Sequence, residues 1–496
     1  MQASGSPSSR RQIVVWASLI LLFLANLGVN WPLTFSFINF GFRDQGSFIT
    51  LDALLQKHLK LAVDVGYLYG LFPVLLQHIL SFFFGRGYWI SLGCGLVYLG
   101  AMAFFWTLAW RQLGASVEFW IVLALLAPLE VMVMPVPAHA MLQLSVMFAL
   151  LFVLQDKLPV AFAVAGLGWL SMPSLPIAAS VLLFGWIVIK WAMEPERSAV
   201  VLLRKLLPGA ATLIGGSLVL GAYFGWDSLR ATVLPFAGAA SYKARKIGIF
   251  GDGWYYLHPP GARIGYYLGT KVGWWIAGTL LLTILAAHTA ILAWAQRKLS
   301  ARGTFILFCW TLHFIFIFIA FGTGYHTMYY DPMIVAGVLA GLLAVPNQLV
   351  RRAILIGFVG LGILGQTTTI RALRAEWKNS QRFQSTGALY APRAFELEWK
   401  PILDRAAQQK VLILSYGNGI TEFFPEVQAP DSWFLLPGLL KENEKKRLIE
   451  QMQEADTVAE ELGGDTVYID QDEEIQRALK RFPKVESGKC FRVWRW

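Results

Sequence analysis

Cysteine and charge are both scarce in this sequence. Its 496 residues contain three cysteines, Cys94, Cys309 and Cys490, which lie far apart with no CxxC pair. Such spacing indicates neither a zinc site nor a disulfide framework. Charged residues make up 15% of the chain and hydrophobic residues 56%. This composition is too apolar for a soluble globular protein, and it predicts an α-helical membrane protein with several spans.

Acidic residues are particularly rare in the first three quarters of the chain. From Ala372 to the end there are 18 Lys and Arg and 20 Asp and Glu, which leaves 24 basic and 11 acidic residues before Ala372. Cytoplasmic loops of membrane proteins carry such a basic excess, whereas nucleic-acid binding requires a basic face on a soluble fold. We therefore expect the basic residues to set membrane topology, and we expect no nucleic-acid partner.

Long apolar runs recur along the chain, and most approach the roughly 20 residues needed to cross a bilayer. The clear runs are 13–32, 89–110, 117–134, 142–154, 203–224, 274–295, 304–321, 332–345 and 354–369, and 159–190 is expected as a hairpin broken at "MPSLP". The run 71–85 carries Gln77 and His78, and is expected to cross, to re-enter or to lie in the interface. We expect about 11 to 13 crossings in total.

Basic clusters give these runs an orientation. The first run follows Arg10 and Arg11, which indicates a signal anchor with a cytoplasmic N-terminus. The clusters at 190–205, 297–302 and 351–352 can all be cytoplasmic if the runs between them pair as hairpins. The loops 33–70 and 225–272, and everything after Arg371, then lie on the outer side.

The last quarter of the chain has a different character. "KVLILS" and "DTVYI" are typical of short buried strands, and "ENEKKRLIEQMQEA" and "EEIQRALKRF" are typical of helices. We therefore expect a transmembrane domain in residues 1–371 and a soluble α/β domain in residues 372–496, the C-terminal domain. Its "SYGNG" segment lacks the spacing of a phosphate-binding loop and is expected to be a turn, in a domain that recognises the acceptor or braces the outer loops.

The loop after the first run combines acids with aromatic residues. Asp44 stands beside Arg43, and Asp64 opens "DVGYLYG", which contains Tyr67 and Tyr69. A carboxylate at the membrane surface is solvated, paired or functional. Asp44 therefore either forms an ion pair with Arg43 or acts as a general base, and the tyrosines either anchor the next span or line a site.

Between these acids, apolar residues recur at helical spacing. The spacing predicts an amphipathic helix lying in the membrane surface. Its apolar positions are Leu51, Leu54, Leu55, Leu59 and Ala62.

This order of features resembles the GT-C-fold membrane glycosyltransferases, in particular bacterial members related to protein mannosyltransferases and aminoarabinose transferases. An acid in the first outer loop, a surface helix and an Asp-x-x-Tyr-x-Tyr-Gly step at Asp64–Gly70 carry the resemblance, which extends over most of the membrane part. The chain departs from the family at "YGLFP", where two residues precede Pro73, and "PVPAH" offers His139 where many relatives have a second acid. The departure at "YGLFP" weakens a role for Asp64 more than one for Asp44.

The resemblance implies an activity and its partners. It implies an integral protein of the bacterial inner (plasma) membrane that takes a polyprenyl-phosphate sugar as donor and works on the outer face, with Asp44 as catalytic base. The acceptor is a lipid, a glycan or a protein, and membrane lipid surrounds the site. A divalent metal stays an open alternative, and no other cofactor is expected. The alternative class is a transporter or flippase of lipid-linked glycans, and a scaffold is a third.

Two later loops supply candidate donor-binding residues. "SYKARKIGIFGDGWYYLHPPGARIGYY" mixes basic and aromatic residues, which either hold the donor phosphate or decorate an ordinary interfacial loop. "FGTGYHTMYYDP" resembles turns that close the donor pocket in relatives, and Asp331 is expected to cap the helix that follows. The full set of expected substrate-binding residues is Arg43, Asp64, Tyr67, Tyr69, Lys243, Arg245, His258, Arg263 and His326.

Overall fold

The computed structural model describes most of the chain. The described residues are 36–85, 87–130, 136–195, 197–234, 239–240, 243, 261–320, 331–382, 389–433, 435, 439–462, 469 and 472–496, together with 16, 17, 20 and 24. Apart from those last positions, the first expected span, residues 13–32, lies outside the described residues, and so does most of "DTVYI".

Apolar runs form the long helices that the sequence predicts. Within the described ranges, seven helices are long and apolar enough to cross a membrane, so the chain is an integral membrane protein. These helices are α6 (Tyr88–Leu113), α8 (Pro137–Leu154), α10 (Leu175–Ala192), α11 (Ala199–Phe224), α16 (Lys271–Gln296), α17 (Ala301–Ala320) and α20 (Gln348–Lys378). Shorter helices in this part are α5 (Phe72–Phe84), α7 (Val117–Glu130), α9 (Leu158–Ser171), α12 (Trp226–Thr232), α15 (Ile264–Gly269) and α19 (Asp331–Leu342).

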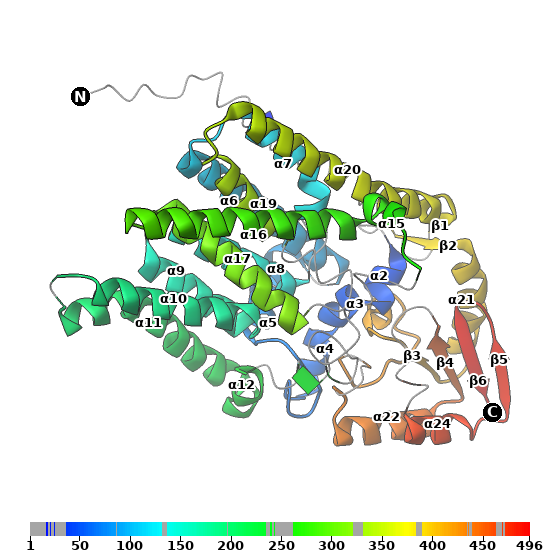
Figure 1. Ribbon diagram of the computed structural model, residues 1–496. Coiled ribbons are helices and arrows are strands. Elements are labelled where there is room, and N and C mark those ends of the chain that lie inside the picture. The colour runs from blue at the N-terminus through cyan, green and yellow to red at the C-terminus, as the bar shows by residue number, and fades with distance from the viewer. Residues whose placement is uncertain are drawn as a thin grey trace.

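The long helices form two neighbouring groups. Helix α9 packs against α8, α10 and α11, while α16 packs against α17, α19 and α20. Helix α17 also contacts α8 and α10, which joins the groups into one bundle (Figure 1). The expected hairpin over 159–190 is confirmed, because α9 ends at Ser171 and α10 begins at Leu175. Pro176 occupies the start of α10, where its missing N–H leaves no helical hydrogen bond unmade.

The C-terminal domain contains a four-stranded sheet. The strands are β3 (Val411–Leu414), β4 (Thr457–Glu461), β5 (Lys484–Ser487) and β6 (Phe491–Arg495), in the order β3-β4-β6-β5. Strand β3 is parallel to β4, and β6 is antiparallel to both β4 and β5. The helices are α21 (Arg393–Ala406), α22 (Glu442–Glu454), α24 (Glu473–Leu479) and the 3-10 helix η2 (Gly419–Glu422), and β1 (Ser380–Arg382) pairs with β2 (Tyr390–Pro392) beside the end of α20. The prediction of a helical membrane part followed by a small α/β domain is confirmed.

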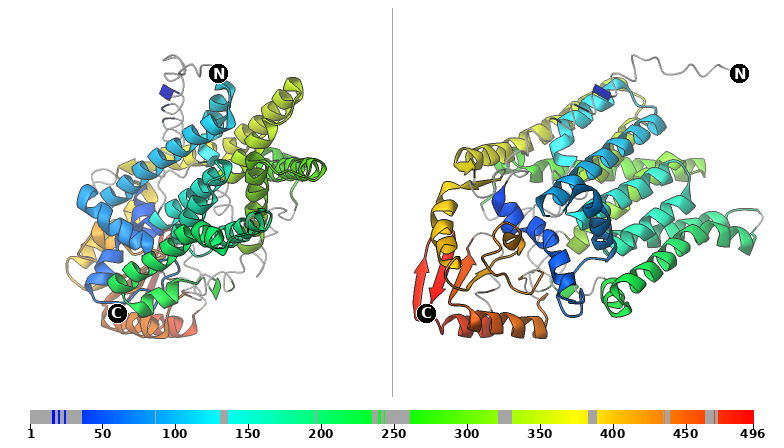
Figure 2. Two further views of the ribbon diagram at one scale, coloured as in Figure 1. Left: turned by 90° about the vertical axis from the view of Figure 1, so that its left-hand side faces the viewer. Right: turned by 180° about the vertical axis from the view of Figure 1, so that it is seen from behind.

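The first loop, residues 36–70, supplies part of the core of that domain. Alternate residues of β3 face opposite sides of the sheet, so Leu412 and Leu414 pack with α22 and α24, whereas Val411 and Ile413 pack with α21. Helix α2 (Phe37–Phe42) covers this second side, and its three phenylalanines are fully buried there. Figures 1 and 2 show α2, α3 (Asp44–Ile49) and α4 (Leu51–Gln56) between the helical bundle and the sheet. The first loop and the C-terminal domain therefore share one hydrophobic core.

The expected surface helix over 51–62 is wrong in length and surroundings. Helix α4 ends at Gln56, and the chain then turns, with His58 and Ala62 at φ of 59° and 62°. Leu51 and Leu54 are buried in the hydrophobic core that the bundle helices form, rather than exposed to a membrane. Apolar spacing of this kind marks a covered face, but it does not tell whether protein or lipid covers it.

Helix α20 continues across the expected domain boundary. It runs without a break through Arg371 to Lys378, and β1 begins at Ser380. A rigid helix therefore leads from the bundle directly into the C-terminal domain.

Candidate functional site

The candidate catalytic acid begins a short helix inside the first loop. Arg43, in extended conformation with φ −123° and ψ −165°, separates α2 from α3, and Asp44 is the first residue of α3. The remaining residues of α3, from Gln45 to Ile49, are buried, whereas Asp44 is half-buried. The carboxylate of Asp44 thus sits at the partly open end of an otherwise enclosed helix.

Arg43 binds an acid of the C-terminal domain. Its Nη1 lies 2.9 Å from Oε2 of Glu461, and its Nη2 donates to Oε1 at 3.0 Å. The Glu461 side chain, on β4, is 4% exposed. Two parallel hydrogen bonds between a guanidinium and a carboxylate fix orientation as well as distance. The sequence predicted Asp44 as a partner of Arg43, whereas its partners in the structure include Glu461, more than 400 residues away.

The "SYGNG" segment is a point of close contact between the first loop and the C-terminal domain. Gly417 N–H donates to the carbonyl of Phe42 at 3.1 Å. A Cβ atom on Gly419 would lie 2.1 Å from the carbonyl oxygen of Phe40 and 2.4 Å from Cα of Gly46, so backbone meets backbone here. The segment bends at Tyr416 and enters η2 at Gly419, and it docks the C-terminal domain onto α2 and α3. We call Gly417–Gly419 the glycine turn.

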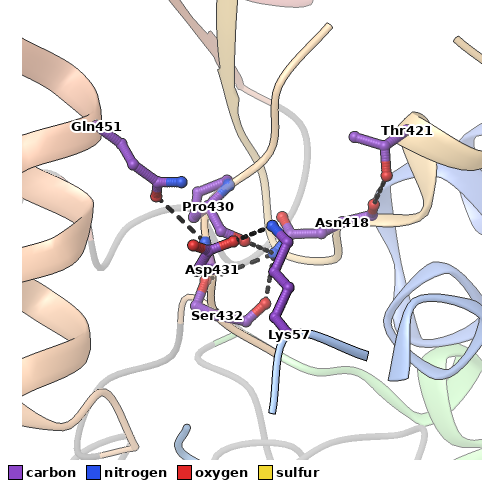
Figure 3. Close-up of polar contacts among 7 residues, drawn as sticks. All are labelled: Lys57, Asn418, Thr421, Pro430, Asp431, Ser432 and Gln451. Carbon is purple, nitrogen blue, oxygen red and sulfur yellow. Dashed lines mark hydrogen bonds and ion pairs between the residues drawn. The ribbon is translucent and has the colours of Figure 1, made fainter. Parts of the chain in front are cut away.

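Asn418, at the centre of the glycine turn, holds a second segment in place (Figure 3). Its Nδ2 donates to the carbonyls of Ser432 at 2.7 Å and Pro430 at 3.3 Å. Between these residues, Asp431 forms an ion pair with Lys57, which follows α4. The 430–432 segment is thus bonded to the glycine turn on one side and to the first loop on the other.

Trp433, which directly follows this segment, belongs to an aromatic cluster. The cluster consists of Phe48, Tyr67, Tyr69, His139 and Trp433. The indole Nε1 of Trp433 donates to the carbonyl of Ser47 at 3.1 Å. Its ring centroid lies 4.5 Å from that of Tyr67 and 5.3 Å from that of Tyr69. The structure therefore brings both predicted tyrosines together directly behind α3.

The two tyrosines differ in their polar contacts. The hydroxyl of Tyr67, a fully buried residue, donates to the carbonyl of Gly70 at 3.1 Å, and burial raises the pKa of this phenol well above its usual value. Tyr67 therefore stays neutral and fixes its own loop. The hydroxyl of Tyr69 lies 2.8 Å from Nε2 of His139, at the start of α8. That hydrogen bond ties the first loop to the bundle.

Asp64 is bonded within the loop and across to α22. Its Oδ2 accepts from the backbone N–H of Lys60 at 2.9 Å, and its carbonyl accepts from Nη2 of Arg447 at 2.7 Å. One turn earlier on α22, Oε2 of the buried Glu444 accepts from the N–H of Gly66 at 2.9 Å. In the described structure, Asp64 shapes the turn that presents residues 66–70 to the C-terminal domain.

The remaining predicted residues are spread over two other loops. Lys243 is exposed, and Arg263 is exposed immediately before α15. Arg245, His258 and His326 lie outside the described residues. Asp331 is the first residue of α19, and its fully buried carboxylate forms an ion pair with Lys271, the first residue of α16. The expected cap is not seen, because neither carboxylate oxygen of Asp331 accepts a hydrogen bond from a described backbone N–H.

The sequence did not predict the residues of the C-terminal domain that contact the first loop. Glu461, Trp433 and Glu444 contact Arg43, Ser47 and Gly66 respectively. A weak signal existed for Glu461, because "TVAEE" ends an apolar strand on two acids that need partners if the strand is buried. Within the described parts of the chain, no group of three or more His, Cys, Asp or Glu side chains is placed to hold a metal ion.

No protein-family model and no curated protein matches the chain. Among solved structures, the chain is similar to the oligosaccharyltransferase of Archaeoglobus fulgidus in complex with Zn and sulfate, with a TM-score of 0.44 and 13% identity over 90% of this chain and 68% of that chain. It is also similar to ArnT from Cupriavidus metallidurans bound to undecaprenyl phosphate, with a TM-score of 0.44 and 12% identity over 99% of this chain and 98% of that chain.

Proposed function

We propose that this protein is a membrane glycosyltransferase. It moves a sugar from a polyprenyl-phosphate donor to a hydroxyl or amine of a lipid, glycan or protein acceptor on the outer face of the membrane. Asp44 is the general base, and the first loop with the C-terminal domain forms the acceptor side of the site. The donor class and the base follow from the sequence resemblance.

The position of Asp44 is the observation that most supports this proposal. A useful base must reach a substrate while its backbone stays fixed. Asp44 is half-buried at the end of a helix whose other residues are buried, so it is the most exposed residue of that helix. That helix is bonded to the C-terminal domain through Ser47 and to the bundle through Gln77, whose Nε2 donates to the carbonyl of Phe48 at 2.6 Å.

The reaction balances with these groups. Asp44 accepts the proton of the acceptor O–H or N–H while the acceptor atom bonds to the anomeric carbon of the sugar. The bond between that carbon and the phosphate oxygen breaks, and the electron pair leaves with polyprenyl phosphate. Inversion at the anomeric carbon follows from a single displacement.

A cation near the phosphate stabilises the developing charge of the leaving group. Lys243, Arg245 and Arg263 are the residues proposed for this role, and the two whose positions are described, Lys243 and Arg263, are both exposed. His258 and His326 are proposed to line the donor side. Arg43, Asp64, Tyr67 and Tyr69 serve the acceptor side by holding the loop, since each is bonded within it or to its neighbours.

Sugar transfer by the purified protein in nanodiscs tests the proposal. Polyprenyl-phosphate sugars are offered as donors with mixed lipid and glycan acceptors, and the released polyprenyl phosphate is measured. We expect turnover with at least one donor. If no donor turns over but labelled lipid-linked sugar crosses the bilayer of reconstituted vesicles, the protein is a carrier and the proposal is wrong.

A further inference from the structure

Arg43 is the single residue between two helices. Helix α2 ends at Phe42 and α3 begins at Asp44, so the backbone of Arg43 sets the angle between them. Helix α2 is fixed by its buried phenylalanines in the core of the C-terminal domain. The contacts of Arg43 therefore help to set where the start of α3, and with it Asp44, lies relative to that domain, in addition to the hydrogen bond from Trp433 to Ser47.

Glu461 holds Arg43 in a single geometry. The pair is bidentate, and the carboxylate lies at the end of β4, where its side chain is 4% exposed against 27% for Arg43. Two parallel charge-assisted hydrogen bonds fix the plane and the distance of the Arg43 guanidinium, and its Nη1 also donates to the carbonyl of Phe42 at 3.1 Å. The surroundings leave little room for adjustment, since a Cβ atom on Gly417 would lie 2.3 Å from the carbonyl oxygen of Arg43.

We infer that Glu461 is a positioning residue, which acts through Arg43 to place Asp44 for proton transfer; this inference rests on the function proposed above. The C-terminal domain then completes the active site without contacting the reacting atoms. Loss of the Glu461 charge lets α3 move relative to the acceptor, and misplacement of a reacting group by about 1 Å can cost a hundredfold in rate.

The neighbouring residue on the same strand provides a matched control. Glu460 is also buried, at 1% exposure of its side chain, and forms an ion pair at 3.4 Å with Arg492 on β6. Its partner lies within the C-terminal domain, because β4 and β6 are paired strands. Glu460→Gln and Glu461→Gln thus each neutralise one buried acid of β4, and among the ion pairs described, that of Glu461 is with the first loop and that of Glu460 is with β6.

Hydrogen exchange tests the positioning independently of any activity. In the full-length protein in nanodiscs, we expect Glu461→Gln to make the amides of residues 44–50 exchange roughly tenfold faster, while Glu460→Gln leaves them at the wild-type rate. Equal exchange in both variants would overturn the inference, even if the protein transfers no sugar. If Glu461→Gln does not fold, Arg43→Gln breaks the same pair from the loop and is held to the same result.

Kinetics separate positioning from a loss of stability. Below the unfolding temperature of every variant, we expect Glu461→Gln to lower kcat about 10-fold to 100-fold with little change in KM, and Glu460→Gln to keep the wild-type kcat. The double variant Arg43→Gln/Glu461→Gln should be no slower than the slower single variant, because both substitutions break one contact. A kcat of Glu461→Gln equal to that of Glu460→Gln would contradict a positioning role.

Discussion

Glu444 is the residue at which the contact between loop and C-terminal domain responds to pH. It is 1% exposed, and burial raises the pKa of its carboxyl to about 7, against the hydrogen bonds from Gly66 and Lys441 and the charge of Arg447, which lower it. A carboxyl with a raised pKa in the folded state binds its proton more tightly there than in the unfolded chain. Its stabilising contribution is therefore complete below pH 4.5 and is lost as the pH rises toward 7.

We expect Glu444→Gln to remove this pH dependence. A pKa change from 4.5 to about 7 corresponds to roughly 3 kcal/mol, so the wild-type protein should lose stability relative to the variant between pH 5 and pH 8 by an amount of that order. Thermal unfolding of both proteins in detergent at the two pH values measures the difference. The exposed Glu442, in the same turn of α22, gives the control variant Glu442→Gln. A constant gap between wild type and Glu444→Gln at both pH values would refute the prediction.

Single residues also show what the sequence could and could not predict. Asp44, Tyr67 and Tyr69 stood out because acids and tyrosines are conspicuous beside an apolar run. Glu461 and Trp433 did not, because an acid or a tryptophan in a soluble α/β segment is unremarkable until its partner is known. Their partners, Arg43 and Ser47, are almost 400 residues or more away, and no local pattern carries such a pairing.

At the scale of elements, the glycine turn brings the backbones of the first loop and the C-terminal domain into close contact. Gly419→Ala would place a Cβ atom 2.1 Å from the carbonyl oxygen of Phe40, which neither backbone can avoid without moving. We expect the substitution to destabilise the protein by about 1–3 kcal/mol, as overpacking does, and to lower its unfolding temperature.

Gly357→Ala is the control for this substitution. Gly357 lies in α20, and a Cβ atom built there meets nothing within 4 Å. Alanine is favoured over glycine in a helix, so this variant should be as stable as wild type or slightly more stable. Thermal unfolding that ranks Gly419→Ala with Gly357→Ala would show that the glycine turn does not bear on the first loop as described.

The sequence predicts a helix well where one physical cause, such as the burial of apolar residues, determines its composition. Apolar runs predicted α6, α8, α10, α11 and α16 closely, because burial in lipid or protein demands the same composition. The expected helix over 51–62 shows the limit, since it ends at Gln56 and its leucines are covered by protein. The spacing of apolar residues can be read from the sequence, but the sequence does not tell whether protein or lipid covers them.

On the scale of the whole molecule, a loop from the start of the described chain packs against the C-terminal domain. The first loop, residues 36–70, packs into the core of the domain that the last quarter of the chain forms. Helix α20 connects the helical bundle to the same domain. Because the first loop and the C-terminal domain share a core, they lie on one side of the membrane. We propose that this side is the outer face, as the basic clusters predict.

The central claim is that Asp44 removes the proton of the acceptor. The most direct measurement is kcat for sugar transfer by Asp44→Asn in nanodiscs, at saturating donor, beside Asp52→Asn. Asp52 is a half-buried acid in α4 of the same loop. We expect Asp44→Asn to fold as wild type and to lose about 10²–10⁴-fold in kcat, the usual contribution of a general base, while Asp52→Asn keeps its rate. A folded Asp44→Asn variant that turns over like Asp52→Asn would contradict the account.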